Sequence, residues 1–329
     1  MRSLRIGRTS WLALLLGLAC FTAGPVAMGE LVISEPFAYD VGDLLGQNGG
    51  TGWGSAWDVF ISSGQTGSAT VESGSLAFSD YATSGNRLRM SSSDSADPNS
   101  TKYVRPFRTT GAEGVTSGDL WVSFLYQRID DASQWTGVLQ NGWSSDGAQL
   151  GIRVNNNPGI HFRMRPNKET SAGIYVRYGD TGVTNAGDGT QTSVDGNTYL
   201  FVTQFKDVNT DTIKPQIAAT MWMLSEADYD AVKGGGLLND NYTLKAVAPD
   251  FSESAWGLEP ASDLRLLHLY RRTFANENHA FVEDLDELRF GNTLADVGLP
   301  AVGIPEPSTL LLAVIGCVLA LSSGRCRRT

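Results

Sequence analysis

Residues 119–127 read DLWVSFLYQ, the most apolar internal stretch of this 329-residue chain. Successive side chains of an extended strand point to opposite faces of the sheet. Four large apolar side chains therefore share one face: Leu120, Val122, Phe124 and Tyr126. Trp121 and Leu125 lie on the other face. Apolar residues on both faces are typical of a central strand covered on both sides, so this stretch predicts a core built on β-sheet.

The rest of the chain repeats short apolar stretches between clusters of turn-forming residues, and 37 glycines contribute to those clusters. This pattern predicts an all-β domain made of two antiparallel sheets. Further strands are expected at 31–37, 70–79, 101–108, 149–154, 160–165, 172–178, 198–205, 216–224, 264–271 and 281–290. The pairs 149–154 with 160–165 and 198–205 with 216–224 are predicted hairpins. Residues 179–195 are expected to form a long turn-rich segment at one rim.

One short helix is expected at residues 226–233. Ser225 stands at the N-cap position, and Asp228 stands three residues later, where its side chain returns the capping hydrogen bond. The glycines at 234–236 end the helix.

The N-terminal residues 1–29 are predicted to be a signal peptide. Arg2, Arg5 and Arg8 form a positive region, an apolar stretch follows, and residues 27–29 (AMG) are a small-x-small cleavage site. No internal repeat or change of composition divides the rest. We therefore expect one β-sandwich domain at 30–297, a linker at 298–304 and a separate C-terminal segment at 305–329.

The C-terminal segment combines three parts. Pro305, Glu306 and Pro307 precede an apolar run at 309–324, and an arginine cluster closes the chain: Arg325, Arg327 and Arg328. Sixteen helical residues span about 24 Å, less than the hydrocarbon core of a bilayer, which is about 30 Å thick. Flanking residues or local thinning of the bilayer cover this difference at modest cost. The run is expected to be a single transmembrane helix, with the arginines on the cytoplasmic side.

This three-part end resembles the PEP-CTERM sorting signal. The resemblance implies an exosortase-type processing enzyme as a partner, and export to the cell surface or an extracellular matrix. The protein would be anchored in the membrane only transiently, through its C-terminal helix. An ordinary C-terminal membrane anchor is the alternative interpretation.

Composition excludes several classes of function. The chain carries a net charge of −10, and the two end segments hold six of its arginines but only one of its glutamates. The exported body is therefore strongly acidic and repels nucleic-acid phosphates, so no nucleic-acid partner is expected. All cysteines lie in the end segments: Cys20, Cys317 and Cys326. The body consequently has no disulfide, thiolate nucleophile or thiolate metal site.

Two further stretches carry a second resemblance. Glu35-Pro36-Phe37 with the glycine-rich residues 46–53 (GQNGGTGW), and the closing residues 286–293 (DELRFGNT), are similar to exported proteins with a concanavalin-like or laminin-G-like jelly roll. The resemblance implies two antiparallel sheets packed face to face, in which the first and last strands pair. It implies a fold more than a function.

Glu283 and Glu287 are the candidate catalytic residues. Concanavalin-like glucanases place three carboxylates on alternate residues of one strand. Glu283 and Glu287 share a face by this alternation, but Leu285 lies where the middle carboxylate should be. Residues four apart on a strand are about 13 Å apart, too far for a retaining carboxylate pair. Structural carboxylates that bond to solvent or turns are therefore the favoured interpretation.

Calcium is the one candidate cofactor. Asp207, Asn209 and Asp211 place oxygen atoms at alternate positions, as a calcium loop begins, but the glycine and glutamate of a full EF-hand loop are missing. Turn chemistry explains this segment equally well. Asp180, Asp188 and Asp286 are further candidate ligands at the rim of a concanavalin-like sandwich.

Four tryptophans in loops rich in Gly, Ser and Asn are candidate sugar-binding residues: Trp53, Trp57, Trp135 and Trp143. An exposed indole face matches the apolar face of a sugar ring in size. For Trp53 and Trp57 we favour the alternative that they close one end of the sandwich as part of the core. Trp135 and Trp143 are the better candidates for an exposed platform.

No nucleophile elbow, phosphate loop or dinucleotide-binding fingerprint is present. These observations favour a non-catalytic binding or adhesion module at the cell surface or in an extracellular matrix, with carbohydrate such as an exopolysaccharide as the expected ligand. A secreted polysaccharide hydrolase or lyase of concanavalin-like fold and a structural matrix component are the two alternatives.

Overall fold

In a computed structural model of the chain, the described residues are 31–61, 67–92, 101–111, 117–129, 148–153, 160–165, 173–178, 181–186, 196–209, 217–236, 238, 244–251, 263–271 and 281–300. The predicted signal peptide 1–29 and C-terminal segment 305–329 lie outside them. Within the described part of the chain, no helix has the length and apolar character needed to cross a membrane.

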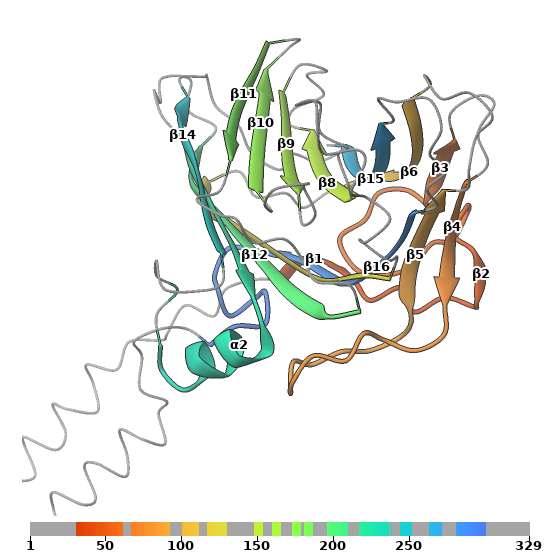
Figure 1. Cartoon of the computed structure of the whole chain (residues 1–329), viewed down its shortest axis with the longest axis horizontal. Helices are drawn as coiled ribbons and strands as arrows, with labels where there is room; N and C mark the ends of the chain where they lie inside the picture. The colour runs from red at the N-terminus through yellow and green to blue at the C-terminus, as the bar shows by residue number, and fades with distance from the viewer. Residues whose placement is uncertain are drawn as a thin grey trace, which may run out of the picture.

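The described residues form two antiparallel sheets that pack face to face as a β-sandwich (Figure 1). The nine-stranded sheet has the order β14 (Leu244–Phe251), β13 (Ile217–Leu224), β12 (Thr198–Asn209), β7 (Ser117–Arg128), β16 (Phe281–Gly291), β5 (Arg87–Ser92), β4 (Gly67–Glu72) and β2 (Gly42–Asp43), with β1 (Leu31–Glu35) also paired to β16. The seven-stranded sheet has the order β11 (Thr181–Ala186), β10 (Gly173–Tyr178), β9 (Ile160–Arg165), β8 (Ala148–Arg153), β15 (Asp263–Arg271), β6 (Thr101–Thr109) and β3 (Asp58–Ile61).

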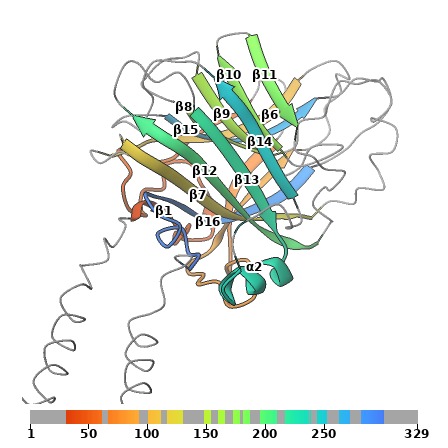
Figure 2. The same ribbon diagram turned by 90° about the vertical axis from the view of Figure 1, so that its left-hand side faces the viewer.

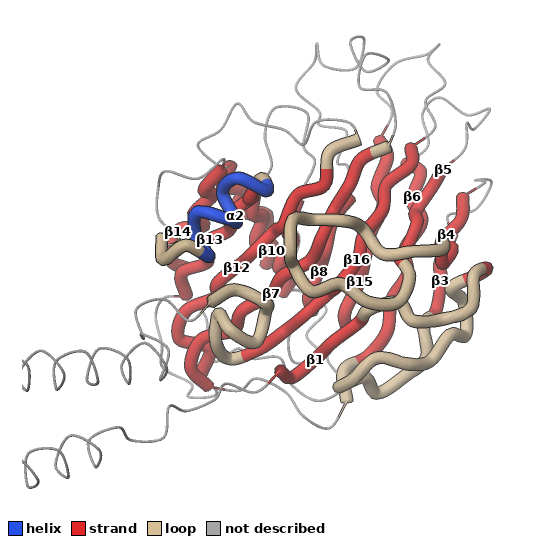
Figure 3. The backbone as a smooth tube through the Cα atoms, turned by 90° about the horizontal axis from the view of Figure 1, so that it is seen from below, coloured by secondary structure: helices blue, strands red, loops and turns tan. Residues whose placement is uncertain are grey.

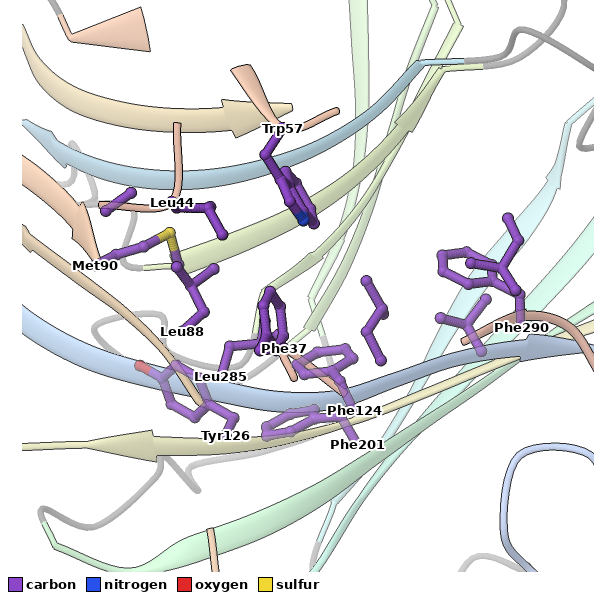
Figure 4. Packing of buried hydrophobic residues seen from close by; sticks show 14 of the residues in the cluster. Phe37, Leu44, Trp57, Leu88, Met90, Phe124, Tyr126, Phe201, Leu285 and Phe290 are labelled. Atoms are coloured by element: carbon purple, nitrogen blue, oxygen red, sulfur yellow. The ribbon is translucent and has the colours of Figure 1, made fainter. Parts of the chain in front are cut away.

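Strand β7 holds the central place that its composition predicts, between β12 and β16. Its even-numbered apolar side chains, from Leu120 to Tyr126, all belong to the core between the two sheets. Figure 4 shows part of this inter-sheet core, where Phe124 of β7 stacks on Phe201 of β12 with ring centroids 5.3 Å apart. Leu125 and Trp121 face away from it, into a second apolar cluster.

The second apolar cluster, here called the outer cluster, covers part of the outer face of the nine-stranded sheet. Helix α2 (Glu226–Lys233) contributes Tyr229 and Val232 to it. Figures 2 and 3 show α2 lying against this face, on the side away from the seven-stranded sheet. The capping box of Ser225 and Asp228 is present as the sequence predicts, and Gly234 ends the helix.

Several strand predictions are confirmed, including both hairpins and the pairing of the first strand with the last. The strand expected at 70–79 ends at Glu72, because Leu76 and Phe78 turn into the outer cluster. The segment 179–195, expected to be turns, contains β11. Strands β2, β3, β5 and β14 were not expected from the sequence. Strands β2 and β3 are short and β5 is rich in polar residues, so their apolar patterns are weak, whereas β14 is interrupted by Lys245, Pro249 and Asp250.

Strand directions define two rims of the sandwich. At one, here called the loop rim, seven strands end and seven begin: β3, β5, β7, β9, β11, β13 and β15 end, while β4, β6, β8, β10, β12, β14 and β16 begin. Seven connections therefore start and end there: 62–66, 93–100, 129–147, 166–172, 187–197, 225–243 and 272–280. The opposite end, where β6 ends and β7 begins, is here called the glycine rim.

The glycine-rich segment 46–57 closes the glycine rim by bonding to both sheets. Ser34 of β1 and Thr51 exchange two backbone hydrogen bonds of 3.1 and 2.9 Å. Beyond them, the amide of Gly54 donates to Thr109 O of β6 at 2.9 Å. Gly52 has a φ of +80°, and a Cβ there would lie 2.0 Å from Val32 O. Only glycine allows this close approach of the loop to β1.

We predict that Gly52→Ala destabilises the protein far more than Gly46→Ala. Both glycines have a φ of +80°, but a Cβ at Gly46 would meet no described atom within 4 Å. Gly46→Ala should lower the free energy of unfolding by about 1–2 kcal/mol through backbone strain alone. Gly52→Ala should cost about 1–3 kcal/mol more, because Val32 O must move. Denaturant unfolding of both variants measures the difference, and equal losses would show that the loop does not need this approach.

Candidate functional site

A buried ion pair joins the two sheets. Arg108 of β6 and Glu35 of β1 are both 0% exposed in their side chains, and Arg108 Nη1 lies 2.6 Å from Glu35 Oε2. The same carboxylate accepts hydrogen bonds from the Tyr39 hydroxyl at 2.7 Å and from the Trp57 indole at 3.0 Å. Burial raises the pKa of the Glu35 carboxyl, while the Tyr39 hydrogen bond and the Arg108 charge act in the opposite direction.

Arg108 also holds the glycine-rich segment. Its Nε and Nη2 donate to Ser55 O at 3.0 and 2.6 Å, and its Nη1 donates to Gly49 O at 3.2 Å. The guanidinium carbon lies 4.4 Å from the centroid of the Trp53 ring and 5.1 Å from that of Trp57. These contacts satisfy the buried charge, as a stable buried ion pair requires.

Of the two tryptophans of this segment, Trp57 is a core residue and Trp53 packs against the core. Trp57 is 1% exposed and belongs to the inter-sheet core, so it presents no face to a ligand. Trp53 is partly buried against the same core. For Trp57 this corrects the candidate role in ligand binding and agrees with the alternative, in which it helps to close one end of the sandwich.

The candidate catalytic residue Glu283 lies inside the sandwich. It is fully buried, accepts a hydrogen bond of 2.8 Å from the Tyr126 hydroxyl, and lies opposite Arg128 in the pairing of β16 with β7. Its neighbour on the same face, Leu285, belongs to the inter-sheet core. A substrate in solution has no access to this carboxylate.

A β-bulge separates Glu287 from Glu283. The register of β16 against β7 shifts between Asp286 and Arg289, and Glu287 has a φ of +50°. The extra residue returns Leu288 to the inter-sheet core, so the strict alternation expected from the sequence is broken. Glu287 instead accepts hydrogen bonds from the amide and hydroxyl of Ser84 and pairs with Arg289 at 2.8 Å. The two glutamates do not share a face, which corrects the expectation from the sequence.

The aspartates between them are also bonded within the protein. Asp284 lies 2.6 Å from Arg87 Nε and 2.8 Å from Arg89 Nε, so it ties β16 to β5. Asp286 accepts hydrogen bonds of 2.8 Å from the amides of Leu76 and Glu287. Burial raises the pKa of Asp286 to about 8. Both of its oxygens are engaged and the side chain is buried, so the structure gives it no role as a calcium ligand.

The remaining calcium candidates are distributed along the fold. Asp207 and Asn209 lie in the last residues of β12, in extended backbone rather than in a calcium-type loop. The others, Asp180, Asp188 and Asp211, lie outside the described residues. Among the described residues, no group of three or more His, Cys, Asp or Glu side chains is placed to hold a metal ion.

Trp135 and Trp143 lie outside the described residues, in the connection 129–147. The two strands that this connection joins, β7 and β8, meet it at the loop rim.

Sequence reasoning missed Arg108, the central cation of the buried network. Its signal was available, because Arg108 alternates with Val104 and Pro106 and therefore shares their buried face.

No family model matches the chain, and no curated protein matches it. Among solved structures, the chain is similar to a marine PL-14 alginate lyase from Aplysia kurodai. The identity is 9%, 66% of this chain and 86% of that chain are covered, and the TM-score is 0.39. It is also similar to a family 11 carbohydrate-binding module from Clostridium thermocellum in complex with a beta-1,3-1,4-mixed-linked tetrasaccharide. The identity is 11%, 79% of this chain and 96% of that chain are covered, and the TM-score is 0.29.

A third similar structure is the exoplasmic/lumenal domain of VIP36 in its Ca2+/Man3GlcNAc-bound form. The identity is 9%, 75% of this chain and 90% of that chain are covered, and the TM-score is 0.33. The sandwich described above rests on the strand pairing of this chain alone, and no function is taken from these three similarities.

We predict that Arg108→Met lowers the free energy of unfolding by about 3–5 kcal/mol, because it leaves the Glu35 carboxylate buried without its counter-charge. The double variant Glu35→Gln with Arg108→Met should recover part of this loss, since no charge then remains in the core. Thermal and denaturant unfolding of wild type, both single variants and the double variant form the required cycle. Strictly additive losses would contradict a direct coupling between the two side chains.

Proposed function

We propose that this protein is an exported, non-catalytic module that binds carbohydrate at the loop rim. In this proposal its sandwich is a jelly roll of the concanavalin-like or laminin-G-like kind, and its C-terminal segment sorts it to the cell surface or an extracellular matrix. The ligand class is a neutral polysaccharide, because the acidic chain repels anionic polymers.

The convergence of seven strand connections at the loop rim is the observation that carries this proposal. Among the described residues, the segment 46–57 covers the glycine rim, with Trp57 buried and Trp53 partly buried against the core. The connection 129–147 at the loop rim contains Trp135 and Trp143 among Gly, Ser, Asn and Asp residues. Indole faces stack on sugar rings, and such polar neighbours bond the hydroxyl groups.

The engagement of the carboxylates of β16 supports the non-catalytic part of the proposal. A retaining glycosidase needs two carboxyl groups about 5–5.5 Å apart on either side of the substrate bond. Glu283 bonds to Tyr126 inside the sandwich, whereas Glu287 bonds to Ser84 and Arg289 beyond the bulge. Neither side chain is available to a polysaccharide.

The end of the described chain supports a short tether between the sandwich and the sorting segment. Val297 O accepts hydrogen bonds from the Tyr81 hydroxyl at 3.0 Å and from Ser123 Oγ at 2.9 Å. Leu299 is 2% exposed and belongs to the outer cluster. The packed body thus extends into the expected linker 298–304, and only a few residues separate it from Pro305. An exosortase-type enzyme is the proposed partner for processing there.

A calcium ion is retained in the proposal as a cofactor at one of the rims. Asp188 belongs to the loop-rim connection 187–197, whereas Asp180 and Asp211 belong to the connections 179–180 and 210–216 at the opposite rim, so each rim offers its own candidate ligands. Carboxylate and carbonyl oxygens of such loops are the ligands that calcium prefers.

The glycan test uses the full chain, purified in mild detergent and incubated with a panel of insoluble neutral and acidic polysaccharides, with calcium and with chelator. We expect retention on at least one neutral polysaccharide without release of new reducing ends. Trp135→Ala and Trp143→Ala should weaken retention about 5- to 10-fold. Glu283→Gln and Glu287→Gln should leave it unchanged in the folded fraction. Release of reducing ends would establish the hydrolase alternative, and retention nowhere would overturn the binding proposal.

The sorting segment is tested by expressing the full chain in a bacterium that has an exosortase-type enzyme. We expect a fall in mass that corresponds to loss of the C-terminal helix, and transfer of the body to the cell surface or medium. Substituting Pro305 and Pro307 by alanine should leave the unprocessed chain in the membrane fraction. Pro300→Ala, outside the motif, is the matched control. Normal processing of the doubly substituted chain would contradict the proposed signal.

A further inference from the structure

Two tryptophans lie together on the outer face of the nine-stranded sheet, beside the outer cluster. Trp121 comes from β7 and Trp222 from β13, on either side of β12, and their rings stack with centroids 6.2 Å apart and an interplanar angle of 15°. Trp222 is 5% exposed and belongs to the outer cluster, whereas Trp121 is only partly buried against it. The pair thus forms the border between the covered and the open part of this face.

The indole nitrogen of Trp222 is a buried donor with no hydrogen-bond partner among the described residues. Buried polar groups are nearly always paired, since an unpaired donor loses its hydrogen bond to water and gains nothing in return. Trp222 pairs with Val202 of β12 and Lys245 of β14, and Thr220 precedes it on the same face of β13. A hydrogen-bond acceptor is the partner that this donor lacks.

Polar side chains adjoin the pair on the open part of the face. Gln204 of β12 lies directly opposite Trp121 in the pairing with β7 and opposite Thr220 in the pairing with β13. Its Nε2 donates to Asp119 Oδ2 at 2.6 Å. All three polar residues are partly exposed. A flat aromatic surface therefore adjoins an amide, a carboxylate and a hydroxyl.

We propose that Trp121, Trp222, Gln204 and Asp119 form a second glycan-binding site, which takes a neutral hexopyranose unit. The apolar face of the sugar stacks on the exposed side of the Trp121 indole, and its hydroxyl groups bond to Gln204 and Asp119. A small rotation of the Trp121 ring uncovers the Trp222 N–H, which then donates to a sugar oxygen. Asp119 and the net charge of −10 disfavour anionic sugars and phosphates.

This inference rests on the proposed function and adds a second contact surface to it. The loop rim lies where β7 ends, whereas Asp119 and Trp121 lie near the start of β7 on the outer face. Two sites that face different directions allow one molecule to hold two glycan chains, or two parts of one chain. Binding at two places raises the overall avidity well above that of either site. The protein would then act as a cross-linker of a neutral polysaccharide.

The test follows the indole N–H signals of the full chain, labelled with 15N and purified in mild detergent, as cellohexaose, laminarihexaose or mannohexaose is added. We expect the Trp222 N–H signal to move downfield with at least one of the three, as it gains an acceptor. Trp121→Ala should weaken binding at this site roughly 10-fold, and Trp222→Phe, which removes the donor but keeps an aromatic ring, roughly 2- to 10-fold. Near-ultraviolet circular dichroism checks that each variant is folded.

The rim variants Trp135→Ala and Trp143→Ala separate this inference from the function on which it rests. If the wild type binds and only the rim variants lose affinity, the outer-face site is overturned and the binding function stands. If Trp121→Ala and Trp222→Phe lose affinity, the outer-face site is supported whatever the rim variants do. If the wild type shows neither binding nor a shifted indole signal with any of the three sugars, both proposals are overturned.

Discussion

The ion pair between Glu35 and Arg108 is the constraint on which the rest of this structure depends. It joins the first strand of one sheet to β6 of the other, and both charges are removed from water. Such a pair is tolerated only when every remaining donor and acceptor is satisfied. Tyr39, Trp57 and three backbone carbonyl and amide groups of nearby segments supply those bonds. The glycine-rich segment therefore has to lie against both sheets, and its close approach to β1 and β6 requires glycine.

The bulge in β16 has a comparable effect on the acidic residues. Together with the alternation of the strand, it divides four carboxylates among three separate sets of partners, and the bulge itself moves Glu287 away from the face of Glu283. Each carboxylate then fixes another part of the fold: Glu283 the neighbouring strand β7, Asp284 the strand β5, and Asp286 and Glu287 the segment 73–86. A cluster that looks like catalytic chemistry in the sequence is thus a set of structural bonds. The strain of Glu287, at φ +50°, is offset by the bonds it makes to Ser84 and Arg289.

Two parts of the described sandwich are covered by the chain itself. The segment 46–57 lies over the glycine rim, and the outer cluster covers the sheet where α2, the segment 73–85 and residues 297–299 pack. The proposed glycan sites lie elsewhere, at the loop rim and beside Trp121. The same outer cluster binds Leu299, so the point at which the C-terminal segment leaves the sandwich is fixed by core packing. In the proposed function, the short tether that results holds the binding module close to the surface that it serves.

The sequence by itself determined the class of fold, because alternation in 119–127, the capping box at Ser225 and the apolar strands are local signals that tertiary contacts did not override. It also favoured Trp53 and Trp57 over Trp135 and Trp143 as residues that close one end of the sandwich. Only the tertiary structure decided where the carboxylates point, because a one-residue bulge reverses every later side chain and leaves no local pattern in the residues. The buried partner of Glu35 was hidden for a related reason. Arg108 is 73 residues away in the chain, and only the stacking of two sheets brings the two charges together.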